Sequence, residues 1–462
     1  MNLVGRTYDK WVKEMEAAGL PDQSFRLHHH VQPPVGWLND PNGLSYYQGQ
    51  YHFFFQYAPF SADGQALKFW GHATSTDLIH WQYHDVAIYP DSPQDIHGVY
   101  SGGTLTIDGQ MELFFTGNVK LAGDYDFIHD GREGNTLRLV SEDGFHFGAK
   151  QCVIPATEYP KDYSCHIRDP KVWKDGSVYY MLLGARRRDD VGCVLLYSSS
   201  DKLNWKFERE IGSKQPFGYM WECPDRIELA GRVFLAMSPQ GVGHQPHRLQ
   251  NVYAAGYLPW TSEPLDEGSF TEWDFGFDFY APQTFVDQKG RTILVGWAGL
   301  PDIPYTNPTV ALGWQHCLTT PRELTLKNGR VCQWPVEEFE SLRSQALELK
   351  NNSSVEVAGT AFDLELIQPQ ESFELSVNEA VSLQFADGLL TLSLSEAAGY
   401  GREKRYCEVE TIRELRILAD SSLLEIYVNG GEQVLTTRYY VPEQNRRLQL
   451  AGQAKAATVW SL

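Results

Sequence analysis

A short polar turn recurs three times in the first half of this 462-residue chain and constrains its fold more than any other feature. Each copy is a Ser/Asp turn that leads to an aromatic residue. The copies are Ser75-Thr-Asp-Leu-Ile-His-Trp81, Ser141-Glu-Asp-Gly-Phe-His-Phe147 and Ser199-Ser-Asp-Lys-Leu-Asn-Trp205. Self-similarity at an interval of roughly 50–70 residues is typical of repeat architectures such as propellers.

Each turn is preceded by a hairpin signal. The β-rich runs Tyr51–Tyr57, Met111–Thr116 and Val178–Leu183 follow Gly-containing turns at 47–50, 107–110 and 174–177. Two weaker copies begin near Trp221 and Phe279. Five all-β units predict an all-β fold with a five-bladed β-propeller, whose blades are four-stranded sheets around a channel. The alternative is a large sandwich in which the turns resemble each other by coincidence.

The sequence changes character near residue 336. Residues 336–350 are rich in good helix formers and predict a helical linker. Beyond it, Leu389–Leu394 and Leu423–Val428 alternate apolar and polar residues, and Asn429-Gly430-Gly431 is a hairpin turn signal. We therefore expect a propeller domain over 1–335, with a short N-terminal extension, and a β-sandwich over 351–462.

The net charge, the cysteines and the lack of long apolar runs indicate which partners and which cellular compartment to expect. The net charge of -20 opposes binding to nucleic acid and to anionic membranes, so neither is expected as a partner. Seven Cys without a CxxC pair favour reduced thiols over a disulfide framework. The N-terminal residues contain no apolar run of signal-peptide length, and no stretch is long enough for a membrane span. A cytoplasmic protein is the expectation.

Three acidic residues stand out because each opens a repeat unit and has a Pro one or two positions downstream: Asp40, Asp169 and Glu222. Proline removes a ladder donor and restricts its neighbour to extended geometry. The first strands of all blades line the channel of a propeller, so we expect these three acids to converge. For any one of them alone, a turn or capping role is the alternative. A pair of carboxylates is what glycoside hydrolysis requires.

Other chemistries lack their motifs. The chain contains no HExxH, Walker loop or GxSxG elbow. His28-His29-His30 is a poor metal site, because successive side chains on an extended segment point to alternate faces. No metal and no cofactor are expected.

Several motifs of the chain resemble those of a known family, glycoside hydrolase family 32. The resemblance covers nearly the whole chain and is carried by Trp37-Leu-Asn-Asp-Pro-Asn-Gly43, Arg168-Asp-Pro170, Glu222-Cys-Pro224, Trp70-Gly-His-Ala-Thr-Ser75 and Asp278-Phe-Tyr-Ala-Pro-Gln-Thr284. It implies a five-bladed propeller followed by a β-sandwich, and a retaining β-fructofuranosidase. Asp40 would be the nucleophile, Glu222 the general acid and base, and Asp169 a stabiliser of the transition state.

The same resemblance implies a set of sugar contacts: Asn39, Gln56, Trp70, Tyr100, Ser101, Arg168, Tyr280 and Trp297. For Trp70 and Trp297, a place in the hydrophobic core is the alternative. The segment 61–69 lacks a Trp that many relatives carry there, which puts the apolar wall of the fructose pocket in doubt.

The sequences of several segments are most similar to those of bacterial sucrose-6-phosphate hydrolases. The expected substrates are therefore sucrose 6-phosphate, sucrose or both, and Lys68, His97, His166 and Arg186 are candidates by position for a phosphate site. Hydrolysis of short fructo-oligosaccharides, fructosyl transfer and non-catalytic sugar binding are the alternatives. The expected partner is a small-molecule sugar, and a monomer and a homodimer are both compatible with the sequence.

Overall fold

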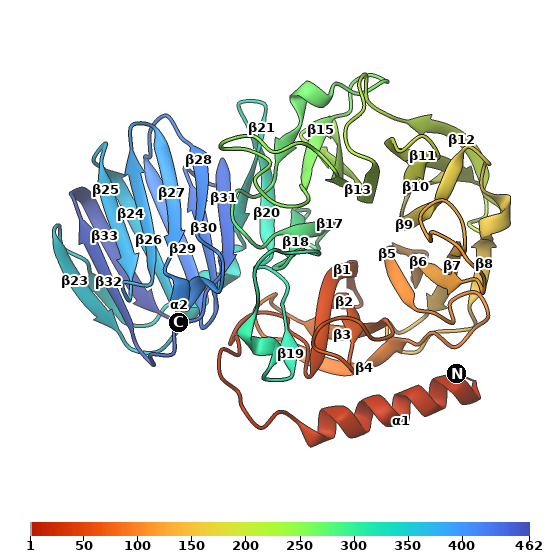
Figure 1. Ribbon diagram of the computed structural model, residues 1–462, viewed down its shortest axis with the longest axis horizontal. Coiled ribbons are helices and arrows are strands. Elements are labelled where there is room, and N and C mark those ends of the chain that lie inside the picture. Colours follow the sequence, from red (N-terminus) through yellow and green to blue (C-terminus); the bar gives the residue numbers. More distant parts are fainter. Residues whose placement is uncertain (1) are drawn as a thin grey trace.

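Five small sheets lie around a common centre in the N-terminal part of the computed structural model, which describes residues 2–462 (Figure 1). The first sheet contains β1 (Gly36–Tyr47), β2 (Gln50–Ala58), β3 (Phe69–Ser75) and β4 (Gln82–Ile88), and the second β5 (Val99–Ile107), β6 (Gln110–Lys120), β7 (Arg132–Ser141) and β8 (Gln151–Ile154). The third contains β9 (Tyr163–Asp175), β10 (Val178–Arg187), β11 (Gly192–Ser199) and β12 (Lys206–Ile211).

The last two sheets have the same order of strands. The fourth contains β13 (Met220–Leu229), β14 (Arg232–Gln240), β15 (Gly256–Pro259) and β16 (Thr271–Glu272), and the fifth β17 (Tyr280–Val286), β18 (Thr292–Trp297), β20 (Arg322–Lys327) and β21 (Arg330–Pro335). The first strands β1, β5, β9, β13 and β17 face the centre and contact one another in cyclic order (Figure 1). This is the predicted five-bladed propeller.

The first and fifth blades are joined by a short parallel pair. β19 (Trp314–Gln315), from the segment between β18 and β20, pairs with β1 at Gly36 and Trp37. Strands from the two ends of the propeller sequence therefore share one sheet.

The recurring Ser/Asp turn has the same geometry in three blades. In the first, the Ser75 hydroxyl accepts from the backbone N–H groups of Asp77 and Leu78, and the Asp77 carboxylate accepts from those of Ile79 and His80. Ser141 with Asp143, and Ser199 with Asp201, repeat this pattern. The turn connects the third strand to the fourth, so the sequence repeat is a structural repeat.

A helix that the sequence analysis did not predict precedes the propeller. α1 (Leu3–Ala18) begins at Asn2, whose side chain accepts from the Gly5 N–H at 3.0 Å. It packs along the first blade, where Asp9 and Glu16 accept hydrogen bonds from Tyr89 and Tyr57 at 2.8 and 2.9 Å (Figure 1). Docking on the blade stabilises a helix whose own apolar stripe is narrow.

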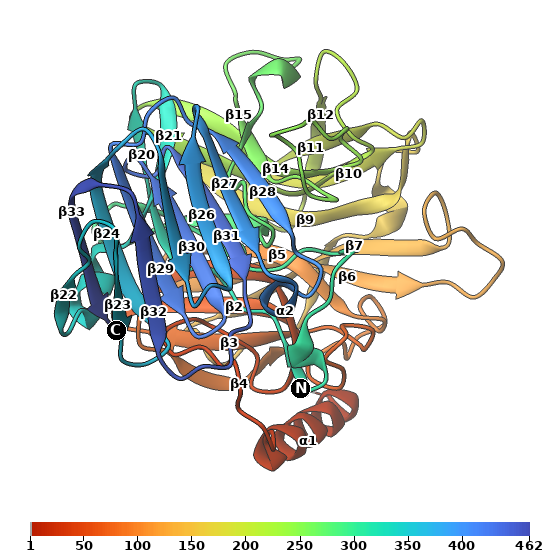
Figure 2. The ribbon, with the colours of Figure 1, turned by 60° about the vertical axis from the view of Figure 1, so that its left-hand side comes forward.

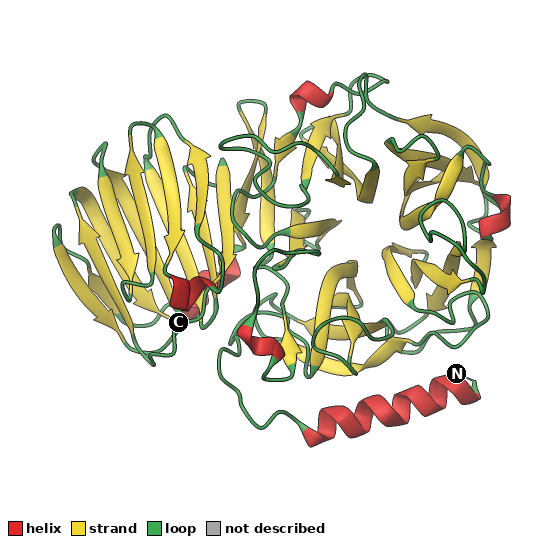
Figure 3. Cartoon of the chain, viewed as in Figure 1, coloured by secondary structure: helices red, strands yellow, loops and turns green. Residues whose placement is uncertain are grey.

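The C-terminal part is a sandwich of two antiparallel six-stranded sheets beside the propeller (Figures 2 and 3). One sheet contains β22 (Ala346–Glu348), β33 (Ala454–Ser461), β24 (Phe362–Pro369), β29 (Glu414–Asp420), β30 (Leu423–Val428) and β31 (Gln433–Arg438). The other contains β23 (Ser353–Val357), β32 (Arg446–Ala451), β25 (Phe373–Val377), β26 (Val381–Ala386), β27 (Leu389–Leu394) and β28 (Lys404–Glu408), and α2 (Glu396–Gly399) follows β27.

The prediction that residues 336–350 form a helical linker is wrong, because the segment contains only a short 3-10 helix and a strand. The 3-10 helix, Glu337–Leu342, occupies its first half, and the short strand β22, Ala346–Glu348, lies in its second half. Arg343 donates to Asp363 at 2.7 Å, and β22 pairs with β33 of the sandwich. Strand pairing and an ion pair to the buried Asp363 outweigh an intrinsic helix preference that is worth only tenths of a kcal/mol per residue.

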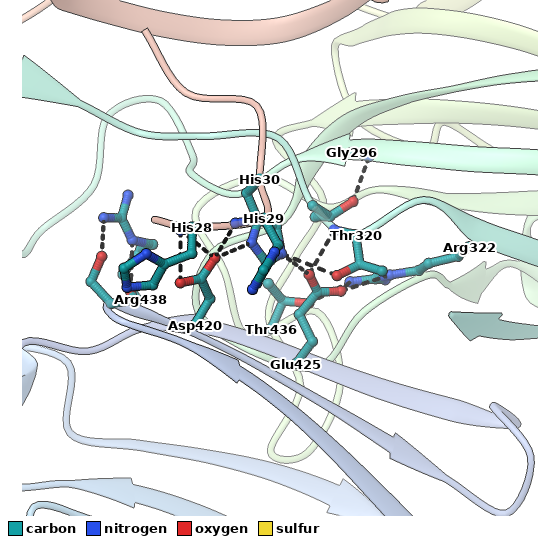
Figure 4. A network of polar contacts seen from close by, with 12 residues as sticks. His28, His29, His30, Gly296, Thr320, Arg322, Asp420, Glu425, Thr436 and Arg438 are labelled. Carbon is teal, nitrogen blue, oxygen red and sulfur yellow. Dashed lines mark hydrogen bonds and ion pairs between the residues drawn. The ribbon is translucent and has the colours of Figure 1, made fainter. Parts of the chain in front are cut away.

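Buried charges hold the two domains together at His30 (Figure 4). The His30 ring lies 2.8 Å from Asp420 through Nδ1, and 3.3 Å from Glu425 through Nε2. Glu425 also accepts from Arg322 of the propeller at 2.8 Å, and all four side chains are buried. His28 contributes its backbone N–H to Asp420, so the run of three histidines is part of a domain interface.

Candidate active site

An irregularity interrupts the pairing of the first strand in all five blades. The register shifts beside Leu38–Pro41 in β1, Tyr100–Gly102 in β5, Arg168–Lys171 in β9, Glu222–Asp225 in β13 and Tyr280–Gln283 in β17. A β-bulge of this kind bends the strand and turns a side chain away from the regular alternation. The bulges therefore place polar side chains from five blades at one end of the centre.

Prolines explain the bulges of the third, fourth and fifth blades. Asp169, Cys223 and Ala281 each precede a proline and each has a positive φ, of 63°, 47° and 46°. Proline cannot donate to the ladder, which interrupts regular pairing. Positive φ in residues other than glycine is uncommon and costs free energy, and such strain concentrates at functional sites.

These side chains line a cavity of about 730 Å³, a size typical of small-molecule sites. Asp40, Asp169 and Glu222 all contribute to its wall. They come from β1, β9 and β13, that is, from three different blades. The predicted convergence of the three carboxyl groups is thus present in the structure.

The Asp40 carboxylate accepts hydrogen bonds from neighbouring side chains. Ser101 on β5 donates its hydroxyl to Oδ2, and Asn39 donates its side-chain amide to Oδ1 at 3.2 Å. Burial raises the pKa of Asp40 to about 6, although the Ser101 hydrogen bond acts in the opposite direction, and the negative charge of Glu222 adds to the rise. Asp40 is consequently an acceptor-only carboxylate at neutral pH, suited to act as a nucleophile.

Glu222 is held by three donors from three other strands. Arg168 donates to Oε1 at 2.5 Å, while Gln240 and Tyr280 donate to Oε2 at 2.9 and 2.6 Å. Its side chain is 16% exposed. A carboxyl group fixed in this way, at the cavity surface and within the field of Asp40, is placed to exchange a proton with a bound molecule.

Asp169 is the most enclosed of the three. Its own N–H donates to the Thr116 hydroxyl at 3.0 Å, and its Oδ2 accepts from the Cys223 N–H at 2.9 Å. Burial raises the pKa of Asp169 to about 7, against the opposing effect of the adjacent Arg168 guanidinium. The negative charges of Glu222 and Asp40 add to the rise in the pKa of Asp169.

Seven of the eight expected sugar contacts line the same cavity: Asn39, Gln56, Tyr100, Ser101, Arg168, Tyr280 and Trp297. Asn39 and Gln56 hydrogen-bond to each other, and Trp37 Nε1 donates to Asn39 at 2.9 Å. Polar groups together with the rings of Trp37 and Trp297 in one lining suit a ligand with both hydroxyl groups and apolar faces.

Trp70 is the exception, and its prediction as a sugar contact is not supported. The side chain is fully buried between the first and second blades, where it packs near Phe54 and Phe115. Its Nε1 donates to the backbone carbonyl of Tyr100 at 3.1 Å. Trp70 lies on β3, the third strand of its blade, so its ring is separated from the cavity by the strands that line it.

Several lining residues were missed by the sequence analysis. Gln240 ends β14 and lies opposite Met220 in the strand pairing, and no local motif marks it. Arg132 begins β7 and also reaches the cavity. The loop from Leu300 to Asn307 supplies a further wall. These positions carry no repeated signal, because each blade contributes a different residue there.

The candidates for a phosphate site are divided. Lys68 lines the cavity, but His97, His166 and Arg186 do not. Lys68 lies in the segment that lacks the expected Trp, and its Nζ is 5.4 Å from the centre of the Trp37 ring. Gly64 of the same segment packs so closely on Trp37 that a Cβ there would lie 2.7 Å from the ring. Trp37 thus supplies apolar surface beside this segment.

Among residues 2–462, no group of three or more His, Cys, Asp or Glu side chains is arranged to hold a metal ion, and no helix is long and apolar enough to cross a membrane. The reactive groups that line the cavity are carboxyl groups. Three carboxyl groups in one cavity lined by hydroxyl, amide and indole groups are an arrangement that can carry out displacement at a sugar carbon.

Comparisons with known proteins agree with this assignment. The sequence profile described as "Glycosyl hydrolases family 32 N-terminal domain" matches residues 30–335, and the one described as "Glycosyl hydrolases family 32 C terminal" matches residues 338–462. A sucrose-6-phosphate hydrolase of Bacillus subtilis is 36% identical over 99% of this chain and 98% of its own length.

Solved structures are similar over the whole chain. The sucrose-6-phosphate hydrolase of Lactobacillus gasseri superposes with a TM-score of 0.87 at 29% identity, covering 98% of this chain and 96% of its own. A β-fructofuranosidase of Bombyx mori in complex with sucrose superposes with a TM-score of 0.86 at 29% identity, covering 100% of this chain and 98% of its own.

Proposed function

Because the chain belongs to glycosyl hydrolase family 32 and is a glycoside hydrolase, we propose that it cleaves the fructosyl bond of sucrose 6-phosphate, sucrose or both, with retention of configuration. The observation that carries the proposal is the meeting of Asp40, Glu222 and Asp169, from three blades, in one cavity. Relatives named for sucrose 6-phosphate and a structural relative bound to sucrose support the substrate class.

The first step forms a covalent intermediate. An Asp40 oxygen attacks the anomeric carbon of the fructosyl unit, the bond to the bridging oxygen breaks, and that oxygen takes the proton of Glu222. Asn39 and Ser101 hold the Asp40 carboxylate in place for the attack. Asp169, fixed by Thr116 and Cys223, is positioned to bind sugar hydroxyl groups and to stabilise positive charge that develops on the ring.

The second step reverses the proton transfer. Glu222, now a carboxylate, takes a proton from water while that water attacks the anomeric carbon and displaces Asp40. Arg168, Gln240 and Tyr280 keep Glu222 in position through both steps. For retention by this route, we expect the carboxyl groups of Asp40 and Glu222 to lie about 5–5.5 Å apart.

The test follows the reaction and its stereochemistry together. Purified enzyme is supplied with sucrose and with sucrose 6-phosphate, and the first fructose anomer released is identified by NMR. β-Fructofuranose as the first product is the expected result, and mass spectrometry is expected to find an Asp40 adduct in Glu222→Gln supplied with an aryl fructoside, whose leaving group needs no proton. α-Fructofuranose would contradict retention. The same product analysis at high sucrose concentration measures fructosyl transfer against hydrolysis.

We also propose that the protein is cytoplasmic and that it is a monomer or a homodimer. The proposed substrate, sucrose 6-phosphate, is a phosphorylated sugar inside the cell, which supports the cytoplasmic location. Light scattering on the purified protein decides between monomer and homodimer.

A further inference from the structure

We propose that Arg132 binds the phosphate group of a phosphorylated leaving-group sugar and so makes the enzyme selective for sucrose 6-phosphate over sucrose. The inference rests on the proposed function, because it assigns a partner to a residue of the same cavity. Arg132 begins β7, opposite Lys120 at the end of β6, at the base of a hairpin that extends outward from the second blade (Figure 2). It lines the cavity that also contains Arg168 and Glu222.

Arg132 differs from the other arginines near it in having no counter-charge. Arg168 pairs with Glu222 at 2.5 Å, and Arg186 and Arg188 pair with Asp190 and Asp130 at 2.7 and 2.8 Å. Among residues 2–462, no carboxylate forms an ion pair with Arg132, and its buried Nε has no hydrogen-bond partner. A buried, unpartnered guanidinium N–H costs free energy that an anionic ligand would recover.

The histidine between these arginines supplies no negative charge either. His166 Nδ1 accepts from Arg168 Nη1 at 2.5 Å, so its other nitrogen, Nε2, carries the proton and donates to the Phe127 carbonyl at 3.1 Å. Burial and the positive charges of Arg168, Arg132 and Arg186 lower the pKa of His166 to about 2. His166 is therefore neutral and supplies no counter-charge to Arg132.

The position of Arg132 corresponds to the leaving-group side. Asp40, with Asn39 and Gln56, belongs to the first blade and marks where the fructosyl unit is attacked. Glu222 gives its proton to the oxygen that leaves, and Arg168 connects Glu222 to His166. β7, which begins at Arg132, packs against β9, which carries His166 and Arg168, and Arg132 lines the cavity together with Arg168.

Phosphate is the anion that this arrangement fits. Sucrose itself carries no charge, whereas the phosphorylated sugar carries a dianionic group on its leaving glucosyl unit. A guanidinium presents paired N–H donors that match two oxygens of a phosphate, and such bonds are stronger than neutral ones.

Lys68 is the less suitable cation of the cavity. Its Nζ already donates to the Gly64 carbonyl, and the negative charges of Asp40 and Asp63 act on it. The Lys68 ammonium group therefore already has a protein acceptor. Arg132 has no such compensation.

The experiment compares kcat/KM for sucrose 6-phosphate and for sucrose in four proteins: wild type, Arg132→Gln, Arg132→Lys and Arg188→Gln. Arg188 is the matched control, because it is an arginine at the same edge with its own carboxylate, Asp130. The wild type is expected to prefer the phosphorylated sugar at least tenfold, which corresponds to about 1.4 kcal/mol. Arg132→Gln is expected to lower that preference at least tenfold, Arg132→Lys to lower it less, and Arg188→Gln to leave it unchanged.

Inhibition by the leaving sugar adds a binding measurement without turnover. Glucose 6-phosphate is expected to inhibit the wild type at least tenfold more strongly than glucose, and this difference is expected to disappear in Arg132→Gln. A wild type without preference, or an Arg132→Gln variant that loses activity on both sugars equally, would overturn the role of Arg132 while leaving fructosyl hydrolysis intact. Absence of turnover of both sugars by the wild type would instead contradict the proposed function itself.

Discussion

Asp278 of the propeller accepts two hydrogen bonds from Arg402 of the sandwich, from Nε and Nη2, each at 2.8 Å. Both side chains are completely buried. Arg402 also donates to Asn307 at 2.7 Å and to the Thr306 carbonyl at 3.1 Å. Thr306 and Asn307 line the active-site cavity, so the sandwich fixes a wall of a site that the propeller otherwise supplies.

Replacing Arg402 by Met is expected to destabilise the protein by about 3–5 kcal/mol, because it leaves the buried Asp278 carboxylate without its cation. The double variant Arg402→Met with Asp278→Asn is expected to be more stable than the sum of the single changes predicts. Denaturant unfolding measures both. Arg413→Met, which removes an exposed pair with Glu432, is the control, with an expected cost below about 1 kcal/mol. An equal loss of unfolding free energy for the Arg402 and Arg413 changes would show that the buried pair stabilises the protein no more than the exposed pair does.

Ser101→Ala is expected to move the acid limb of kcat/KM to higher pH. Asp40 attacks as a carboxylate, so activity rises with pH through its pKa of about 6. The Ser101 hydrogen bond lowers that pKa, and its removal raises the pKa by about 0.5–1 unit, given the usual net worth of one hydrogen bond. The pH profile of each variant measures the shift, and Ser101→Thr, which keeps a hydroxyl, is the control. An unmoved limb would assign it to another carboxyl group, with Asp169 the next candidate.

Glu222→Gln is expected to lower kcat on sucrose by about 10²–10⁴-fold, the usual contribution of general acid–base catalysis. The loss in the first step is expected to be smaller for an aryl fructoside, because its leaving group needs no proton. Azide is expected to restore turnover of that substrate, since it attacks the intermediate without a general base. Asp40→Asn is the matched control, and azide is not expected to rescue it. Equal losses on both substrates would argue against Glu222 as the proton donor.

His30 is expected to make the domain interface sensitive to alkaline pH. Its pKa is about 9 in the folded protein, because hydrogen bonds to Asp420 and Glu425 outweigh its burial, against an ordinary 6.5. A raised pKa contributes stability that is complete below pH 6.5 and is lost as the pH rises through about 9. The full effect is about 3 kcal/mol.

Thermal unfolding between pH 6.5 and 10 measures this contribution. The wild-type Tm is expected to fall over that range, and the Tm of His30→Gln is expected to start lower and to change less. His146→Gln replaces an exposed histidine paired with Asp143 and is expected to follow the wild type. Parallel curves for the wild type and His30→Gln would remove His30 from the pH dependence.

The local patterns of the sequence were enough to predict the architecture. The Ser75 and Asp77 turn closes through hydrogen bonds within four residues, so the same letters give the same turn in each blade. Asn429 and Gly430 both have positive φ at the predicted hairpin between β30 and β31. The acids next to prolines pointed to the cavity for a similar reason, because proline disturbs the strand in which it lies.

What the sequence left undetermined depends on contacts between distant segments. The direction of the Trp70 ring, the arrival of Gln240 at Glu222 and the missing counter-charge of Arg132 follow from how neighbouring blades face one another. The segment 336–350 forms a 3-10 helix, Glu337–Leu342, and a strand, Ala346–Glu348, because the sandwich offers a sheet edge and Asp363. A short motif determines a turn through its own hydrogen bonds, whereas the partner of a side chain is decided by the packing of residues that may lie a hundred positions away.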